Sequence, residues 1–113
     1  MRTEPIYQTR KITDLKDMMI QSANLYGSRN AFLIKDKNGE YYGKTYSELK
    51  NEIDALGTAL IDLGLKDKKI AILSQNRAEW CTTYLTVTGG VGVVVPLDKE
   101  LPFNEIENLI SRA

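Results

Sequence analysis

The chain has 113 residues, of which 42% are hydrophobic and 27% are charged, so it suffices for one small folded domain and is too apolar for a disordered segment. Its 15 Lys and Arg residues balance 15 Asp and Glu residues, which argues against a general nucleic-acid-binding protein, because such proteins need a basic surplus. With one cysteine, Cys81, and no histidine, the sequence excludes an internal disulfide, zinc sites built from Cys and His, and nucleophilic catalysis by a Ser-His or Cys-His pair.

The N-terminal residues 1–12 are polar and irregular, and we expect them to form an arm that packs against the rest of the chain. They lack the apolar core of a secretory signal, and no apolar run approaches the roughly 20 residues that span a bilayer. We therefore expect no transmembrane segment, and the single thiol favours the reducing cytoplasm.

The first predicted elements are a helix and a hairpin. Thr13 is expected to cap a helix that runs to about residue 26, and Gly27 to end it in a left-handed conformation. Residues 31–34 then predict a strand, Asn38-Gly39 a tight turn, and residues 41–44 the returning strand.

The clearest local signal starts at Thr45. Thr45 and Glu48 have the spacing of a capping box, in which each side chain accepts a hydrogen bond from the other residue's backbone N–H. Behind it lies one apolar stripe at helical spacing, closed by Gly64 and formed by Tyr46, Leu49, Ile53, Leu56, Leu60 and Leu63.

Strands and helices then alternate to the end of the chain. Residues 69–74 predict a buried strand, Asn76 and Glu79 a second capped helix through about residue 88, residues 91–95 a second buried strand closed by Pro96, and Pro102 the start of a last helix. We predict an α/β fold in which an N-terminal helix and an antiparallel hairpin precede alternating helix–strand units that form a small parallel sheet.

Ligands of parallel sheets gather at the carboxyl ends of the strands. Here those ends are the segments 74–76 and 96–99. Any site in this chain should therefore involve these two loops, with Asp98 and Lys99 as candidate ligand contacts and a solvated loop as the simpler interpretation.

Other candidate features have stronger structural explanations. Gly89-Gly90-Val91-Gly92 follows a helix and precedes a strand, the reverse of a phosphate-binding fingerprint, so we expect a turn. Asn76 is expected to act mainly as a helix cap with Glu79 as its partner, Trp80 as a core residue and Cys81 as an inert buried thiol. No pair of carboxylates or metal cluster stands out in the sequence.

The order of motifs from Thr45 onward resembles the opening of the adenylate-forming (AMP-binding) superfamily, in particular its long-chain fatty acyl-CoA synthetase branch. The resemblance rests on Thr45-Tyr46-Ser47-Glu48-Leu49, on Leu63-Gly64-Leu65, on the strand that leads to Asn76-Arg77-Ala78-Glu79-Trp80, and on the Gly90–Leu97 segment that ends in Pro96-Leu97. It covers the chain from about residue 10 to its end. In this comparison Thr45, Glu48, Asn76, Glu79, Trp80 and Pro96 are signature positions with structural roles.

The resemblance implies a reaction for a parent enzyme. A fatty acid would react with ATP and magnesium to give an acyl-adenylate, and the CoA thiol would then displace AMP. The family's phosphate loop and its catalytic residues have no counterpart in residues 1–113, so we expect no catalytic residue here and no tight binding of ATP, magnesium or CoA. The loop at Asp98-Lys99 would lie near CoA.

The resemblance also implies that residues 13–113 are the N-terminal portion of a larger AMP-binding domain, whose remainder would be the chain's partner. Two alternatives stay open: a self-contained α/β binding module, and a piece of a related enzyme that uses an aryl or amino acid. A truncated parallel sheet leaves open edges, so we expect the chain to form oligomers or to exchange elements between copies.

Overall fold

The computed structural model of the protein describes residues 4–113 and has a mixed α/β architecture. Its elements follow in the order α1 (Leu15–Tyr26), β1 (Asn30–Lys35), β2 (Tyr41–Thr45), α2 (Tyr46–Asp62), β3 (Lys69–Leu73), α3 (Ala78–Thr86), the short π-helical segment η1 (Val87–Val91), β4 (Val93–Leu97) and α4 (Phe103–Arg112). β1 and β2 pair antiparallel, whereas β3 and β4 pair parallel. The predicted fold class is confirmed.

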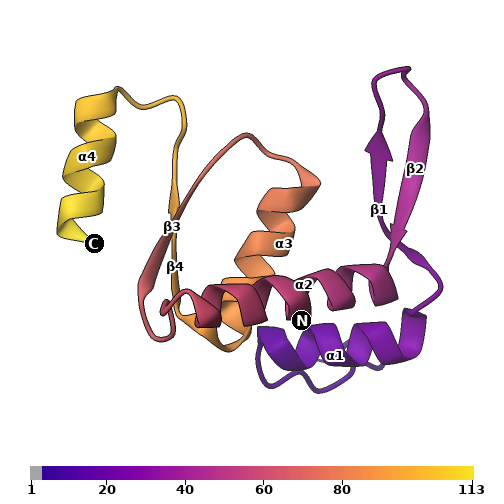
Figure 1. The fold of residues 1–113 in the computed structure, drawn as a ribbon. Helices are drawn as coiled ribbons and strands as arrows, with labels where there is room; N and C mark the ends of the chain where they lie inside the picture. Colours follow the sequence, from indigo (N-terminus) through magenta and orange to yellow (C-terminus); the bar gives the residue numbers. More distant parts are fainter. Residues whose placement is uncertain (1–3) are drawn as a thin grey trace.

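The elements form an open arrangement (Figure 1). α1 and α2 lie side by side, the hairpin β1–β2 rises near one end of α2, and β3, β4 and α4 rise toward the other, with α3 between them. Residues 4–14 form no helix or strand, and residues 1–3 of the predicted arm lie outside the described part of the chain. Met19, Leu49 and Ile53 form the core between α1 and α2.

The ends of α1 differ from the prediction. The cap is Asp14 and not Thr13, because the Asp14 carboxylate accepts the Asp17 N–H at 2.7 Å, while the Thr13 N–H donates to the Asp17 carboxylate at 3.1 Å. Gly27 is right-handed (φ −49°, ψ −38°), so the expected left-handed end was wrong. The Gly27 carbonyl instead accepts the N–H of Ser47 at 3.1 Å, which ties the end of α1 to the start of α2.

The hairpin turns where Asn38-Gly39 predicted. Gly39 has φ +83°, which favours glycine. The Asp36 carboxylate also accepts the backbone N–H groups of Asn38 at 2.8 Å and Glu40 at 3.0 Å, so this side chain fixes the turn from its first residue.

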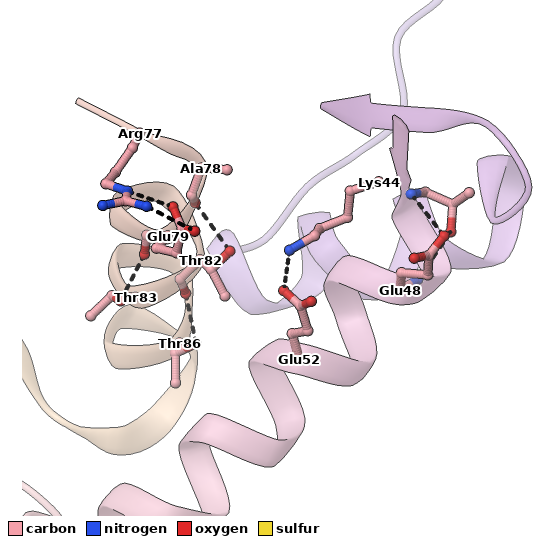
Figure 2. A network of polar contacts seen from close by, with 10 residues as sticks. Lys44, Glu48, Glu52, Arg77, Ala78, Glu79, Thr82, Thr83 and Thr86 are labelled. Carbon is pink, nitrogen blue, oxygen red and sulfur yellow. Dashed lines mark hydrogen bonds and ion pairs between the residues drawn. The ribbon is translucent and has the colours of Figure 1, made fainter. Parts of the chain in front are cut away.

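The capping box of α2 is present in the structure (Figure 2). The Thr45 hydroxyl accepts the Glu48 N–H at 3.1 Å, and the Glu48 carboxylate accepts the Thr45 N–H at 3.4 Å. Gly64 follows the helix with φ +83°. The predicted apolar stripe is buried only in its first half, because Leu63 lies beyond the core and is 74% exposed.

β3 and β4 pair in register from Lys69 with Val93 to Leu73 with Leu97. Pro96 therefore lies within β4, opposite Ile72, and does not close the strand as predicted. The Val93 N–H donates to the Lys68 carbonyl at 2.9 Å, and residues of a strand alternate in direction, so the position of Pro96 faces away from β3 and needs no N–H there.

The two strands are also less buried than predicted. In β3 only Ile72 is buried among five residues, and Leu73 is 47% exposed. Full burial of a parallel strand requires neighbours on both edges and both faces, and this sheet has two strands.

The start of α3 also differs from the prediction. Arg77, not Asn76, precedes the helix as the cap residue, and no side chain caps it. The Glu79 carboxylate accepts a hydrogen bond from Arg77 Nε at 2.9 Å instead of binding the backbone of Asn76 (Figure 2). The polar side chains further along α3 bond to their own helix, since the hydroxyls of Thr82, Thr83 and Thr86 each donate to the carbonyl four residues earlier.

The glycine-rich segment is a turn, as predicted. α3 continues into η1, Gly90 has φ +125°, and the Gly92 N–H donates to the Val87 carbonyl at 3.1 Å. The Lys66 ammonium donates to the Gly90 carbonyl at 2.7 Å and holds this turn against the end of α2.

The last helix, α4, begins directly after Pro102. Its apolar face is mostly uncovered: Ile106 is buried, whereas Phe103 is 80% and Ile110 52% exposed.

Candidate functional site

The carboxyl ends of β3 and β4 lie together because Leu73 pairs with Leu97. The loops that follow them enclose a shallow cleft of about 310 Å³, lined by Ser74, Asn76, Trp80, Leu97, Asp98, Lys99 and Glu100. Asn76, Asp98 and Lys99 from the two loops thus share one cleft with Trp80 from the first turn of α3. This is the juxtaposition that the strand-end rule predicts.

Trp80 forms one wall of the cleft. Its ring stacks on that of Tyr84, one helical turn later, with centroids 5.3 Å apart and planes 20° from parallel. Trp80 is half-buried and is not a core residue as predicted, since it lies in the first turn of α3 where the cleft opens. Its position allows the ring to contact a ligand as well as to pack.

The opposite wall is the loop after β4. The Asp98 carboxylate accepts the Glu100 N–H at 2.9 Å, and the Asp98 carbonyl accepts the Leu101 N–H at 3.3 Å. Asp98 therefore shapes the loop. The Lys99 ammonium pairs with the Glu100 carboxylate at 2.9 Å, but the side chains are 43% and 75% exposed, and such surface pairs are weak. Lys99 can consequently exchange this partner for an anionic ligand at little cost.

The other signature residues lie outside this cleft. Thr45 and Glu48 cap α2, and Pro96 is inside β4. Glu79 forms an ion pair with Arg77 and lines a different cavity. The Glu79 backbone N–H and the Arg77 guanidinium together hold the pKa of the Glu79 carboxyl below its usual range.

That second cavity, of about 800 Å³, lies between the hairpin and the start of α3. Apolar side chains of both elements line it, among them Phe32, Ile34 and Cys81, and the thiol is only half-buried. Although larger, this cavity lies beside an antiparallel pair, away from the carboxyl ends of parallel strands. We interpret it as packing surface.

The described residues do not fit a magnesium triphosphate. Within residues 4–113 no group of three Cys, Asp or Glu side chains is placed to hold a metal ion. Around the cleft, Lys99 is the cation and two acidic side chains, Asp98 and Glu100, accompany it. The cleft can offer a stacking surface and one ammonium group, which suits an aromatic or singly anionic part of a larger ligand.

One participant, Tyr84, was not predicted from the sequence. Tyr84 supports Trp80, and the signal was their spacing of four residues along a helix. Glu100 belongs to the charged loop that the sequence indicates, but its pairing with Lys99 was not predicted, because no sequence signal distinguishes that pair from a solvated loop.

No helix in the described part of the chain has both the length and the apolar character needed to cross a membrane.

Comparisons with known proteins give a consistent result. The family described as AMP-binding enzyme matches residues 20–113. An uncharacterized acyl–CoA ligase of Bacillus subtilis (strain 168), YtcI, is 30% identical over 88 residues, which are 77% of this chain and 17% of that protein. Fatty acyl-CoA synthetase A of Dictyostelium discoideum is 29% identical over 113 residues, which are 99% of this chain and 16% of that protein.

Among solved structures, the acetoacetyl-CoA synthetase of Streptomyces lividans superposes with a TM-score of 0.78 at 16% identity, over 88% of this chain and 16% of the synthetase. That likeness shows the fold. The chain thus spans about one sixth of the length of the relatives that it matches, 17% and 16% in the two cases.

Proposed function

Because the chain belongs to the AMP-binding enzyme family, we propose that it is the N-terminal segment of a long-chain fatty acid–CoA ligase. Such a ligase forms an acyl-adenylate from ATP and a fatty acid and then a thioester with CoA. The single observation that carries the proposal is the alignment of 99% of this chain with a fatty acyl-CoA synthetase. The chain's Asn76–Trp80 segment, which is similar to the long-chain branch, supports the same substrate class.

The alternative substrate classes are aryl and amino acids. A similar fold occurs in an acetoacetyl-CoA synthetase, so the fold alone does not select the acid. The two cavities described above are open to the surface and do not have the enclosed shape of an acyl tunnel. The proposal therefore assigns acid selection to the rest of a parent enzyme.

We further propose that residues 13–113 are the N-terminal portion of the AMP-binding domain, preceded by an arm at residues 1–12. By itself this portion is catalytically incomplete. The parent enzyme would use ATP, magnesium and CoA, and it would work in the cytoplasm.

Within that enzyme, the cleft at the strand ends is the segment's contribution. Lys99 would contact an anionic group of CoA, and Asp98 would hold the loop that carries Lys99. Thr45, Glu48, Asn76, Glu79, Trp80 and Pro96 would keep structural roles. The competing proposal is a self-contained binding module that reuses the family's opening, and a stop codon directly after Ala113 would favour it.

The test uses the longest protein that the reading frame encodes. We expect Lys99→Ala to raise the KM for CoA several-fold and to leave the KM for ATP and for the fatty acid unchanged, because Lys99 reaches only the cleft. Lys37→Ala, on the hairpin turn, is the control and should change neither KM. A normal KM for CoA in Lys99→Ala would contradict the assignment of this loop.

A further inference from the structure

The cleft at the strand ends has one flat aromatic wall, the indole ring of Trp80. Trp80 lines the cleft from the first turn of α3 and is half-buried. Tyr84 stacks on the indole with the ring centroids 5.3 Å apart and the planes 20° from parallel. Aromatic rings at this separation attract each other, so Tyr84 covers one face of the indole and holds the ring in place. The cleft therefore contains a surface that is already oriented for stacking.

The charges of the cleft decide which part of a ligand can enter it. Lys99 is the cation among the lining side chains, and Asp98 and Glu100 are the two carboxylates. One positive and two negative groups give the lining a formal charge of −1, which repels a group with several phosphate charges. An uncharged ring meets no such repulsion. A single phosphate can still reach the Lys99 ammonium from outside, since the Lys99 side chain is 43% exposed.

The polar groups of the cleft match the edge of an adenine ring. Adenine presents an amino donor beside a ring-nitrogen acceptor, and an Asn side chain can bind both at once. Asn76 lines the cleft, and its side chain does not cap α3, because Arg77 is the cap residue and no side chain caps the helix. The carboxylates of Asp98 and Glu100 are acceptors for the same amino group. The cleft thus combines a stacking surface with hydrogen-bonding groups that suit this base.

We propose that the cleft binds the adenine ring of CoA, an inference that rests on the proposed function, in which CoA meets this loop. Trp80 stacks on the base, the Asn76 amide binds its edge, and Lys99 pairs with one phosphate of the same nucleotide. These contacts add to the structural roles of Asn76 and Trp80. The volume of about 310 Å³ lies at the lower end of the range for pockets that hold drug-sized molecules, so the cleft takes one part of CoA and not the whole cofactor.

The first test compares two thiol acceptors, in the longest protein that the reading frame encodes. CoA carries adenine, whereas phosphopantetheine carries the same reactive thiol without it. We expect Trp80→Leu to lower kcat/KM for CoA by about 5- to 150-fold, the range that base–aromatic stacking provides. The same variant should leave kcat/KM for phosphopantetheine and the KM for ATP unchanged. Both acceptors are measured on one preparation, so their ratio does not depend on the fraction of protein that is folded.

Two further variants make this test specific. Trp80→Phe keeps a ring that can stack and should retain most of the preference for CoA. Tyr41→Leu removes an aromatic ring that is 66% exposed on the hairpin, away from the cleft, and should leave the ratio at its wild-type value. Equal losses for CoA and phosphopantetheine in Trp80→Leu would overturn the proposal. A rise in the KM for ATP in place of that for CoA would also overturn it, because the adenine would then belong to ATP.

Tryptophan fluorescence gives a second test that needs no turnover. Trp80 is the single tryptophan among the 113 residues, and a purine stacked on an indole quenches its emission. The probe is the adenosine bisphosphate that forms the nucleotide half of CoA. Quenching in wild type minus quenching in Trp80→Phe isolates the contribution of Trp80. We expect this difference to saturate with the adenosine bisphosphate and to be zero with phosphopantetheine.

The fluorescence test also separates this proposal from the proposed function. A protein that shows no Trp80-dependent quenching with the adenosine bisphosphate would overturn the adenine site, whatever its activity. A protein that shows the quenching but forms no acyl-CoA would support the adenine site and overturn the proposed function instead.

Discussion

Gly92 illustrates a single residue whose lack of a side chain holds two elements together. It lies between η1 and β4, and a Cβ atom added there would overlap the carbonyl oxygen of Lys68. That oxygen also accepts the Val93 N–H at 2.9 Å, a hydrogen bond that joins the two segments at the start of the parallel pair. Close backbone approach, and not a left-handed conformation, is the reason for glycine, because its φ of −173° is extended.

We expect Gly92→Ala to destabilise the chain by about 1–3 kcal/mol, the usual cost of overpacking against atoms that cannot yield. The control is Gly89→Ala, where an added Cβ meets nothing within 4 Å. That substitution should be neutral or stabilise the helical segment by up to about 1 kcal/mol. Urea unfolding measures both values, and equal free energies of unfolding for the two variants would contradict this explanation.

Single interactions could be predicted where both partners are close in sequence and no other side chain competes for either of them. Thr45 and Glu48 have the capping-box spacing, and the structure contains that box. Asn76 and Glu79 have the same spacing, but Arg77 binds the Glu79 carboxylate and the helix begins one residue later than expected. The spacing of Asn76 and Glu79 does not show that a charged residue between them, Arg77, will bind the Glu79 carboxylate instead.

At the scale of elements, α3 has an N-terminus that depends on charge, because no side chain caps it. Glu79 lies in its first turn, where a carboxylate is favourable. Its own backbone N–H lowers the pKa most, followed by the Arg77 guanidinium. Since the folded pKa is depressed, the stabilisation is present above the ordinary pKa of 4.5 and is lost as pH falls through the lower folded value.

We expect Arg77→Gln to raise the Glu79 pKa part of the way toward 4.5, because the backbone N–H remains. NMR titration of the side-chain carboxyl measures this directly. Arg112→Gln, at the far end of the chain, should leave the titration unchanged. The effect on stability will be small, since the Arg77 and Glu79 side chains are 63% and 66% exposed. If the Glu79 pKa were the same in Arg77→Gln as in wild type, the ion pair would not form in solution.

The helices and strands themselves could be predicted from the sequence more reliably than their burial and their positions in the sheet. All predicted helices and strands exist, because periodicity, turns and caps are local signals. The burial of β3 and the position of Pro96 inside β4 could not be predicted, because they depend on how many strands the sheet has. The apolar residues of a strand predict that it is buried, but they do not show whether the neighbouring strands that would bury it belong to the same stretch of sequence.

At the scale of the molecule, the meeting of the two strand-end loops could be predicted and their side-chain contacts could not. The topology rule places Asn76 and Lys99 at one edge of the sheet, and both line the same cleft. The pairing of Lys99 with Glu100, and the stack of Trp80 on Tyr84, depend on rotamers that no rule of spacing fixes. The open arrangement of the elements could not be predicted either, because the sequence does not show which apolar side chains stay exposed.

The central claim is that this chain supplies part of an adenylate-forming enzyme without its chemistry, and ATP–pyrophosphate exchange tests it most directly. The purified 113-residue chain is incubated with ATP, magnesium, labelled pyrophosphate and a long-chain fatty acid, beside an active family member as the positive control. We predict no exchange above the level without fatty acid, because the resemblance to the family leaves its phosphate loop and catalytic residues without a counterpart in residues 1–113. Robust exchange that depends on the fatty acid would contradict the account.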